Sequence, residues 1–192
     1  MAVEAVVFDV GETLIDETGM WERAADAVNV PRFTLMGVLG GLAARGERHT
    51  DVWGRLGVDP PESTWQLSDF YPDALPCIDR LHRCGYRVGA AGNTPATVEP
   101  ALRELFDTVG SSAAWGVEKP SGGFFDRVAG LVGLEPGKIA YVGDRVDNDI
   151  LPALAAGFVA VHIRRGPWGH LHEAPPDAIC IRSLDQLPAV LV

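Results

Sequence analysis

Cysteine, lysine and long hydrophobic runs are all scarce in this chain of 192 residues. The three cysteines, Cys77, Cys84 and Cys180, form neither a C-x-x-C pair nor an even-numbered framework, which favours reduced, buried thiols. No apolar run approaches the roughly 20 residues that a membrane-spanning helix needs. The first residues lack the basic stretch of a signal peptide. We therefore expect a cytoplasmic protein with no membrane partner.

Positive charge is also in short supply, because 16 lysine and arginine residues stand against 26 aspartate and glutamate residues. The resulting net charge of −10 repels nucleic acids and anionic membranes, so neither is expected as a partner. Hydrophobic residues make up 47% and charged residues 22% of the chain, which excludes disordered and fibrous classes. The length predicts one domain, or one domain with a modest insertion.

A regular alternation of helices and strands is predicted from residue 73 onward. Apolar runs and helical spacing predict strands at 3–8, 86–91, 109–114, 139–142, 159–163 and 178–181, and helices at 74–84, 95–106, 121–132 and 147–156. Such an alternation indicates a parallel sheet with helices on both faces. We therefore expect an α/β fold built on a doubly wound parallel sheet.

The segment 16–72 interrupts this alternation. It has helical spacing at 20–28 and 33–44, and the remainder is polar and rich in turn residues. We expect two parts, an α/β core of residues 1–15 and 73–192 and a small α-helical cap of residues 16–72, inserted after the first strand. Five aromatic residues are expected to form the core of this cap: Trp21, Trp53, Trp65, Phe70 and Tyr71.

Polar residues follow the predicted strands of the core. The segments concerned are Asp9–Thr13, Gly92–Thr94, Glu118–Pro120 and Gly143–Asp149. Ligands of an open α/β sheet bind at the carboxyl ends of its strands, so we expect these segments to meet there. Converging carboxylates repel one another unless a cation lies among them, and carboxylate and carbonyl oxygens suit Mg²⁺. A lysine beside them suits phosphate, and an aspartate can form a covalent aspartyl-phosphate.

In order and spacing, these segments resemble the motifs of the haloacid dehalogenase (HAD) superfamily of hydrolases. That family has a strand ending in D-x-D-x-T, a second strand ending in serine or threonine, a Lys-Pro pair before a helix, and a strand ending in G-D-x-x-x-x-D. The corresponding stretches are FDVGETL at 8–14, AGNT at 91–94, WGVEKP at 115–120 and YVGDRVDND at 141–149. The resemblance covers nearly the whole chain and implies a Rossmann-like HAD core.

The resemblance also implies a role for each matching residue. Asp9 would be the nucleophile and a Mg²⁺ ligand. The carbonyl of Gly11, together with Asp144 and Asp149, would complete the metal site. Lys119 would neutralise the charge of the phosphate and of the nucleophile. Phosphate binding is assigned to Asn93, Thr94, Thr13 and Lys119, with Thr13 also ordering the first loop.

Two glycines depart from the family pattern. Gly11 stands where the phosphatases of the family have their general acid/base aspartate, and glycine has no proton to give. Gly92 stands where the family has serine or threonine. General acid–base help is worth roughly 10²–10⁴-fold in rate, so its loss predicts slow hydrolysis of phosphate monoesters. Three nearby acids are candidates to replace it: Glu12, Asp16 and Glu17.

The expected function is that of a Mg²⁺-dependent HAD-type hydrolase, a phosphatase acting on a small phosphorylated metabolite through an aspartyl-phosphate. Two alternatives stay open at this point. One is a dehalogenase-type enzyme that acts on carbon without a metal, since a halide leaving group needs no proton. The other is a catalytically silent relative that binds phosphate or a protein partner, which the two glycines favour.

Overall fold

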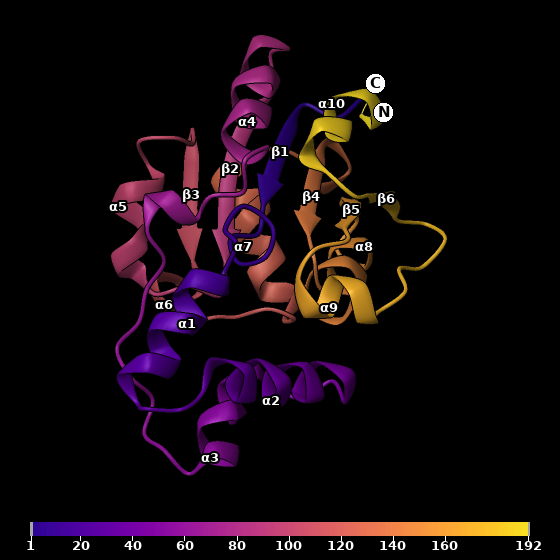
Figure 1. Ribbon diagram of the computed structural model, residues 1–192. Coiled ribbons are helices and arrows are strands. Elements are labelled where there is room, and N and C mark those ends of the chain that lie inside the picture. The colour runs from indigo at the N-terminus through magenta and orange to yellow at the C-terminus, as the bar shows by residue number, and fades with distance from the viewer. Residues whose placement is uncertain (1, 192) are drawn as a thin grey trace.

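Six parallel strands form a central sheet in the order β3-β2-β1-β4-β5-β6 (Figure 1). In this computed structural model, which describes residues 2–191, the strands are β1 (Ala5–Phe8), β2 (Arg87–Gly92), β3 (Thr108–Ser111), β4 (Ile139–Gly143), β5 (Val159–Ile163) and β6 (Ile179–Ile181). The strand order changes direction between β1 and β4, which is where an open sheet binds its ligands. The predicted α/β fold with a doubly wound parallel sheet is confirmed.

The innermost strand, β1, contributes to both faces of the sheet. It is buried throughout and pairs in parallel with β2 on one side and β4 on the other. Val6 and Phe8 belong to one hydrophobic cluster, and Ala5 and Val7 belong to another. This division follows from strand geometry, because successive side chains point to opposite faces. Both faces are therefore apolar and need a covering layer.

Helices supply both layers. Their bounds are α4 (Ala74–Arg83), α5 (Glu99–Leu102) and α10 (Leu187–Val190) on the first face, and α7 (Gly122–Val132) and α8 (Leu151–Ala155) on the second. Two short helices, α6 (Ser112–Trp115) and α9 (Gly166–Leu171), follow β3 and β5. Within residues 2–191, no helix is long and apolar enough to cross a membrane.

A separate group of helices lies below the carboxyl ends of the strands in Figure 1. It comprises α1 (Thr18–Ala27), α2 (Arg32–Ala44) and α3 (Val52–Leu56). These helices enclose a third hydrophobic cluster, in which Leu35, Leu39 and Trp53 are joined by Trp168 of α9. The group thus packs on the sheet-bearing part through α9. That residues 16–72 act as a cap stays a prediction.

The aromatic residues of this segment divide between two clusters. Trp53 is buried in the helical cluster and Trp21 packs against it. Trp65, Phe70 and Tyr71 pack instead against the hydrophobic cluster of the sheet, so the expectation that they form the core of the cap is wrong. The backbone explains the difference, because the N–H of Tyr71 donates to the carbonyl of Leu14 and returns the chain to the sheet.

Several boundaries also differ from the sequence-based expectation for local reasons. The third strand ends at Ser111, where its hydroxyl accepts a hydrogen bond from the N–H of Ala114 and begins α6. The helix expected at 95–106 is reduced to a 3-10 turn followed by α5. Helices α3 and α9 were not predicted. Of the three cysteines, Cys77 is buried whereas Cys84 and Cys180 are exposed, so the expectation of buried thiols holds only for Cys77.

We expect Phe125→Ala to destabilise the fold by about 3–5 kcal/mol, because it removes a large buried ring and leaves a cavity. Phe125 is fully buried and lies between Tyr141 and Phe158, with ring centroids 5.1 and 5.7 Å away. Urea unfolding measures the change. Leu131→Ala on the same helix is the matched control, since Leu131 is exposed and its truncation should cost less than about 1 kcal/mol. Equal losses in the two variants would contradict the assigned packing of α7.

Candidate functional site

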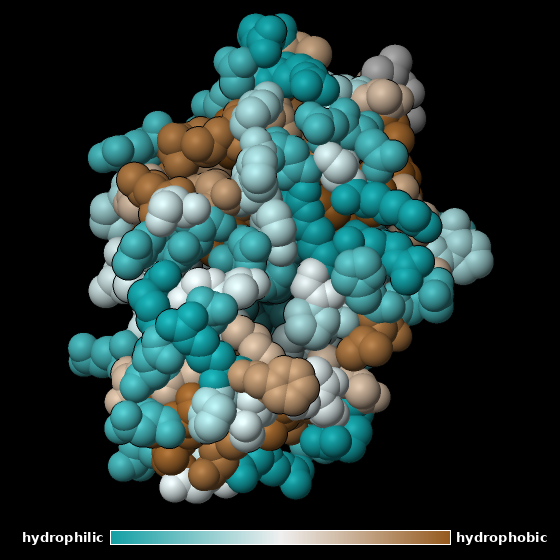
Figure 2. Space-filling view, in the orientation of Figure 1, coloured by the Kyte–Doolittle hydropathy of each residue, from teal (hydrophilic) through white to brown (hydrophobic). Residues whose placement is uncertain are grey.

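A cavity of about 450 Å³ lies at the carboxyl end of the sheet. Figure 2 shows a hollow near the centre of the view, between the helical group and the sheet-bearing part. The sequence-predicted residues on the wall of the cavity are Asp9, Gly11, Asn93, Thr94, Lys119 and Asp144. All the motif segments that follow the strands therefore reach one site. Asp149 is fully buried beside it, within reach of Asp9 and Asp144.

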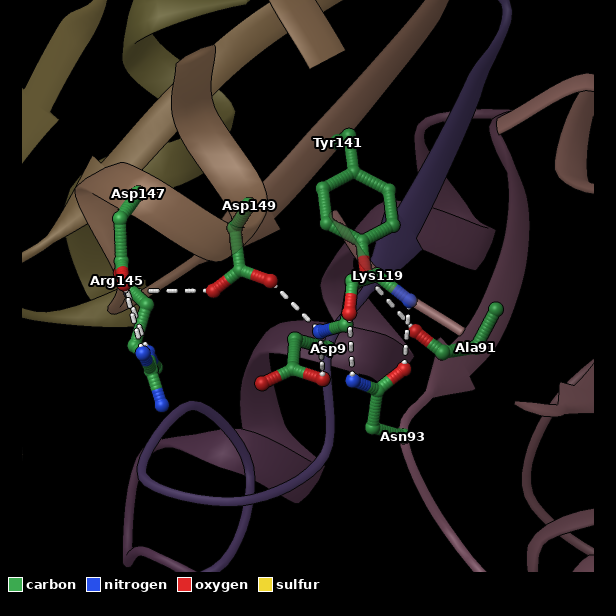
Figure 3. Close-up of polar contacts among 8 residues, drawn as sticks. All are labelled: Asp9, Ala91, Asn93, Lys119, Tyr141, Arg145, Asp147 and Asp149. Atoms are coloured by element: carbon green, nitrogen blue, oxygen red, sulfur yellow. Dashed lines mark hydrogen bonds and ion pairs between the residues drawn. The ribbon is translucent and has the colours of Figure 1, made fainter. Parts of the chain in front are cut away.

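The Lys119 ammonium lies between two carboxylates at the centre of the site (Figure 3). Its Nζ is 2.6 Å from Oδ1 of Asp9 and 2.5 Å from Oδ1 of Asp149. The lysine side chain is only 1% exposed. Burial by itself lowers the pKa of Lys119, but the charges of Asp149 and Asp9 outweigh it and raise the pKa well above its usual value. The group therefore stays a cation within the sheet edge.

The side chain of Asn93 holds the main chain of this lysine in place (Figure 3). Its Nδ2 donates to the carbonyl of Lys119 at 3.0 Å, and its Oδ1 accepts from the N–H of Lys119 at 2.8 Å. Asn93 follows β2, so it ties the lysine loop to a strand end. The structure thereby gives Asn93 a positioning contact that the sequence did not indicate. Phosphate binding by its remaining N–H stays a prediction.

Three carboxylates approach one another closely enough to share a cation. Oxygen atoms of Asp9, Asp144 and Asp149 all lie within 4.8 Å of one another. Among the described residues, no hydrogen bond or ion pair reaches the side chain of Asp144, although it is only 3% exposed. Burial, followed by the charges of Asp149 and Asp9, raises the pKa of Asp144 well above its usual value. A positive ion beside Asp144 would remove this penalty.

Asp149 is less open to an added ligand than its two neighbours. Its Oδ1 is taken by Lys119, and its Oδ2 accepts a hydrogen bond from the N–H of Arg145 at 3.0 Å. Both carboxylate oxygens are therefore engaged within the protein. This arrangement assigns Asp149 chiefly to holding Lys119, with Asp9 and Asp144 presenting the freer oxygens.

Two glycines of the motifs leave space that a neighbouring carboxylate occupies. A Cβ at Gly92 would lie 2.6 Å from Oδ1 of Asp9, and a Cβ at Gly143 would lie 2.5 Å from Cγ of Asp149. Both distances are shorter than side-chain contacts allow. Gly92 therefore replaces the family's serine or threonine at a point where Asp9 already fills the available space.

The two threonines assigned to phosphate occupy different positions. Thr94 lies on the wall of the cavity, and its hydroxyl is buried without a hydrogen-bond partner. Thr13 is fully buried and lies outside the cavity wall, and its carbonyl accepts a hydrogen bond from Arg165 at 2.9 Å. The Thr13 hydroxyl is also buried without a hydrogen-bond partner, so loop ordering by its side chain stays a prediction, whereas direct phosphate contact fits Thr94 better.

The space left by Gly11 is taken by Glu17. A Cβ at position 11 would overlap Oε1 of Glu17 and would lie 3.0 Å from its Cδ. Burial, followed by the charge of Glu12, raises the pKa of Glu17 to about 7. In the sequence, Glu12, Asp16 and Glu17 are equally good candidates for the acid. Only their contacts in the structure distinguish them.

Other residues of the cavity wall were missed by the sequence reasoning. They are Arg48, His49, Thr50, Ser112, Arg145, Asn148 and Trp168. Arg145 lies within a motif and was open to recognition, whereas residues 48–50 belong to a turn with no periodic signal. The guanidinium carbon of Arg145 lies 5.0 Å from the ring centroid of Trp168. Both the helical segment and the sheet therefore contribute to the wall.

In metal-free buffer, we expect Asp144→Asn to stabilise the protein at pH 8 by at least about 1 kcal/mol, the energy of one pKa unit. The folded-state pKa of Asp144 is raised, so the carboxyl costs stability as the pH rises from about 4 through that pKa, and it costs nothing at lower pH. The extra stability of Asp144→Asn over the wild type should therefore shrink towards zero near pH 4.

Urea unfolding in the presence of a chelator, over this range of pH, measures the difference. Asp147→Asn is the matched control, because ion pairing with Arg145 outweighs burial and lowers the pKa of Asp147. The Asp147→Asn variant should be less stable than the wild type at pH 8, not more stable. A wild type more stable than Asp144→Asn at pH 8 would rule out the raised pKa.

Comparison with known proteins identifies the family. A family model for haloacid dehalogenase-like hydrolases matches residues 3–157. A glyceraldehyde 3-phosphate phosphatase from Methanopyrus kandleri is 28% identical, over 96% of this chain and 94% of its own length.

Two solved structures share the fold. A HAD phosphatase from Thermococcus onnurineus is 21% identical with a TM-score of 0.67, covering 98% of each chain. An L-2-haloacid dehalogenase from Xanthobacter autotrophicus is 18% identical with a TM-score of 0.73, also covering 98% of each chain. The resemblance inferred from the motifs is thus confirmed: the chain belongs to the haloacid dehalogenase-like hydrolases.

Proposed function

We propose that this hydrolase is a Mg²⁺-dependent phosphatase that acts on a small phosphorylated metabolite through an aspartyl-phosphate at Asp9. The observation that carries the proposal is the buried Lys119 ammonium, 2.6 Å from Asp9, with the unpaired carboxylate of Asp144 in the same cluster. A nucleophile, a fixed cation and a free metal ligand thus share one cavity. The phosphatase from Methanopyrus kandleri supports the same reaction class.

The donor set fits Mg²⁺. The carboxylates of Asp9 and Asp144 and the carbonyl of Gly11 would hold it, with Asp149 alongside. All are oxygen donors, as Mg²⁺ prefers. One fixed cation against three clustered carboxylates leaves negative charge for the metal to neutralise. When bound, the ion supplies positive charge that reduces the repulsion between a phosphate and the carboxylate that attacks it.

The residues of the chain divide the reaction between them. The Asp9 carboxylate attacks phosphorus, and the bond from phosphorus to the leaving oxygen breaks as the new one forms. Lys119 offsets the negative charge of the phosphoryl group, and the hydroxyl of Thr94 is available to one of its oxygens. Water then attacks the aspartyl-phosphate, which releases phosphate and restores the Asp9 carboxylate.

In this proposal, residues 16–72 form a cap over the cavity. Support comes from residues 48–50, which line the cavity opposite the strand ends. A cap of this kind excludes water and selects the substrate. The volume of about 450 Å³ suits a small metabolite better than a large one.

The dehalogenase alternative receives less support. The L-2-haloacid dehalogenase is only 18% identical to this chain, so its structural similarity concerns the fold alone. Attack on carbon with loss of halide makes no use of the unpaired carboxylate of Asp144 in the cluster with Asp9. A catalytically silent relative would retain the fold but would show no turnover, so it is distinguished by experiment.

We expect Asp9→Asn to reduce hydrolysis of p-nitrophenyl phosphate by more than about 10³-fold, because it removes the nucleophile. Phosphate release in the presence of Mg²⁺ measures turnover, and a chelator should abolish it in the wild type. Asp126→Asn is the control, since Asp126 is exposed on α7. A wild type inactive on every phosphate tested would favour the silent relative.

We expect Asp144→Asn to weaken Mg²⁺ binding by more than about tenfold, because it removes a charged ligand. Titration calorimetry with Mg²⁺ alone compares this variant with the wild type and with Asp126→Asn. Equal affinity in all three proteins would remove Asp144 from the metal site.

A further inference from the structure

The carboxyl of Glu17 occupies the place of a side chain at position 11. A Cβ built on Gly11 would overlap Oε1 of Glu17, with Cδ of Glu17 only 3.0 Å away. Position 11 is two residues beyond Asp9, and both residues line the same cavity. A carboxyl at this point therefore faces the region where a group bonded to phosphorus would leave.

Glu17 is held in this position by one oxygen only. Its Oε2 accepts a hydrogen bond from Nε1 of Trp21 at 3.1 Å, one turn along α1. Its main-chain N–H donates to Oε1 of Glu12 at 3.1 Å. Within residues 2–191, no hydrogen bond reaches Oε1 of Glu17, the atom that lies against Gly11. One oxygen thus anchors the side chain, and the other is available to a ligand.

The other two nearby acids are engaged elsewhere. Both oxygens of Glu12 accept hydrogen bonds, one from the N–H of Glu17 and one from the hydroxyl of Tyr71 at 2.7 Å. Asp16 accepts from the N–H of Thr18 at 2.9 Å and does not line the cavity. Glu118 does line the cavity, but it is exposed, and the three atoms nearest to a Cβ at position 11 all belong to Glu17.

We propose that Glu17 is the catalytic acid of this enzyme, supplying from the start of α1 the carboxyl that position 11 lacks. The inference rests on the proposed phosphatase function. As Asp9 attacks phosphorus, the bond to the leaving oxygen breaks and Glu17 transfers its proton to that oxygen. Water then attacks the aspartyl-phosphate, one of its protons stays on the released phosphate and the other passes to solvent. The Glu17 carboxylate is reprotonated from solvent, which returns both groups to their starting state.

Leaving groups that differ in their need for a proton test this role. An alkoxide requires protonation as it leaves, whereas p-nitrophenolate does not. Glu17→Gln should therefore lower kcat for glyceraldehyde 3-phosphate and glycerol phosphate by about 10²–10⁴-fold. It should change kcat for p-nitrophenyl phosphate by less than about fivefold, since Asp9 and Lys119 are intact. Glutamine keeps an oxygen for the Trp21 indole. Asp16→Asn is the matched control and should leave both rates unchanged.

The outcomes separate this inference from the proposed function. Equal rates of wild type and Glu17→Gln on the alkyl phosphates overturn the role of Glu17, and so does an equal loss on alkyl and aryl phosphates. A wild type that hydrolyses no phosphate overturns the phosphatase function, and this inference with it. Aryl turnover in Glu17→Gln also reports that the variant folds.

A second variant keeps the test open if Glu17→Gln does not fold. Glu17→Ala removes the acid, and adding Gly11→Asp places a carboxyl in the space that is vacated. The ratio of alkyl to aryl turnover should be at least tenfold higher in the double variant than in Glu17→Ala. A ratio no higher than that of Glu17→Ala overturns the proposal.

Discussion

The contact on which the site depends is the buried ion pair of Lys119 with Asp9 and Asp149. Taking three charges out of water costs several kcal/mol per ion, which only close contacts repay. The fold meets this requirement by bringing three segments together at the edge of the sheet. Asp9 follows β1, Asp149 lies beyond β4, and Asn93 after β2 fixes the main chain of the lysine. The central strands are thus arranged around one cation.

The sequence predicted the parts of this arrangement that are local. Strand ends are marked by apolar runs that stop at polar residues, so Asp9 and Asp144 were found, and parallel topology placed them together. The Asn93 contact was not predictable, because both of its hydrogen bonds run to the backbone of Lys119, which no side-chain pattern encodes. Helix α9 was missed for a related reason. The apolar partners of Trp168 lie on α2, which is distant in the sequence, so no local pattern indicates them.

Glycine positions show the same limit in a sharper form. In the sequence, Gly11 and Gly92 read as losses from the family pattern. In the structure, each marks a space filled by a carboxylate, from Glu17 at position 11 and from Asp9 at position 92. A missing side chain and an occupied space are indistinguishable in one sequence. Only the contacts in the structure show that the carboxyl of another residue, Glu17, lies beside position 11.

The position of Glu17 has a consequence for the helical segment. Asp9 is attached to the sheet, whereas Glu17 immediately precedes α1 and is anchored to Trp21 on that helix. Glu12 connects the two, because it lies in the first loop and binds both the N–H of Glu17 and the hydroxyl of Tyr71. An acid at position 11 would move with the nucleophile. An acid at Glu17 moves with α1 instead, so proton transfer requires that the helical segment be docked on the sheet.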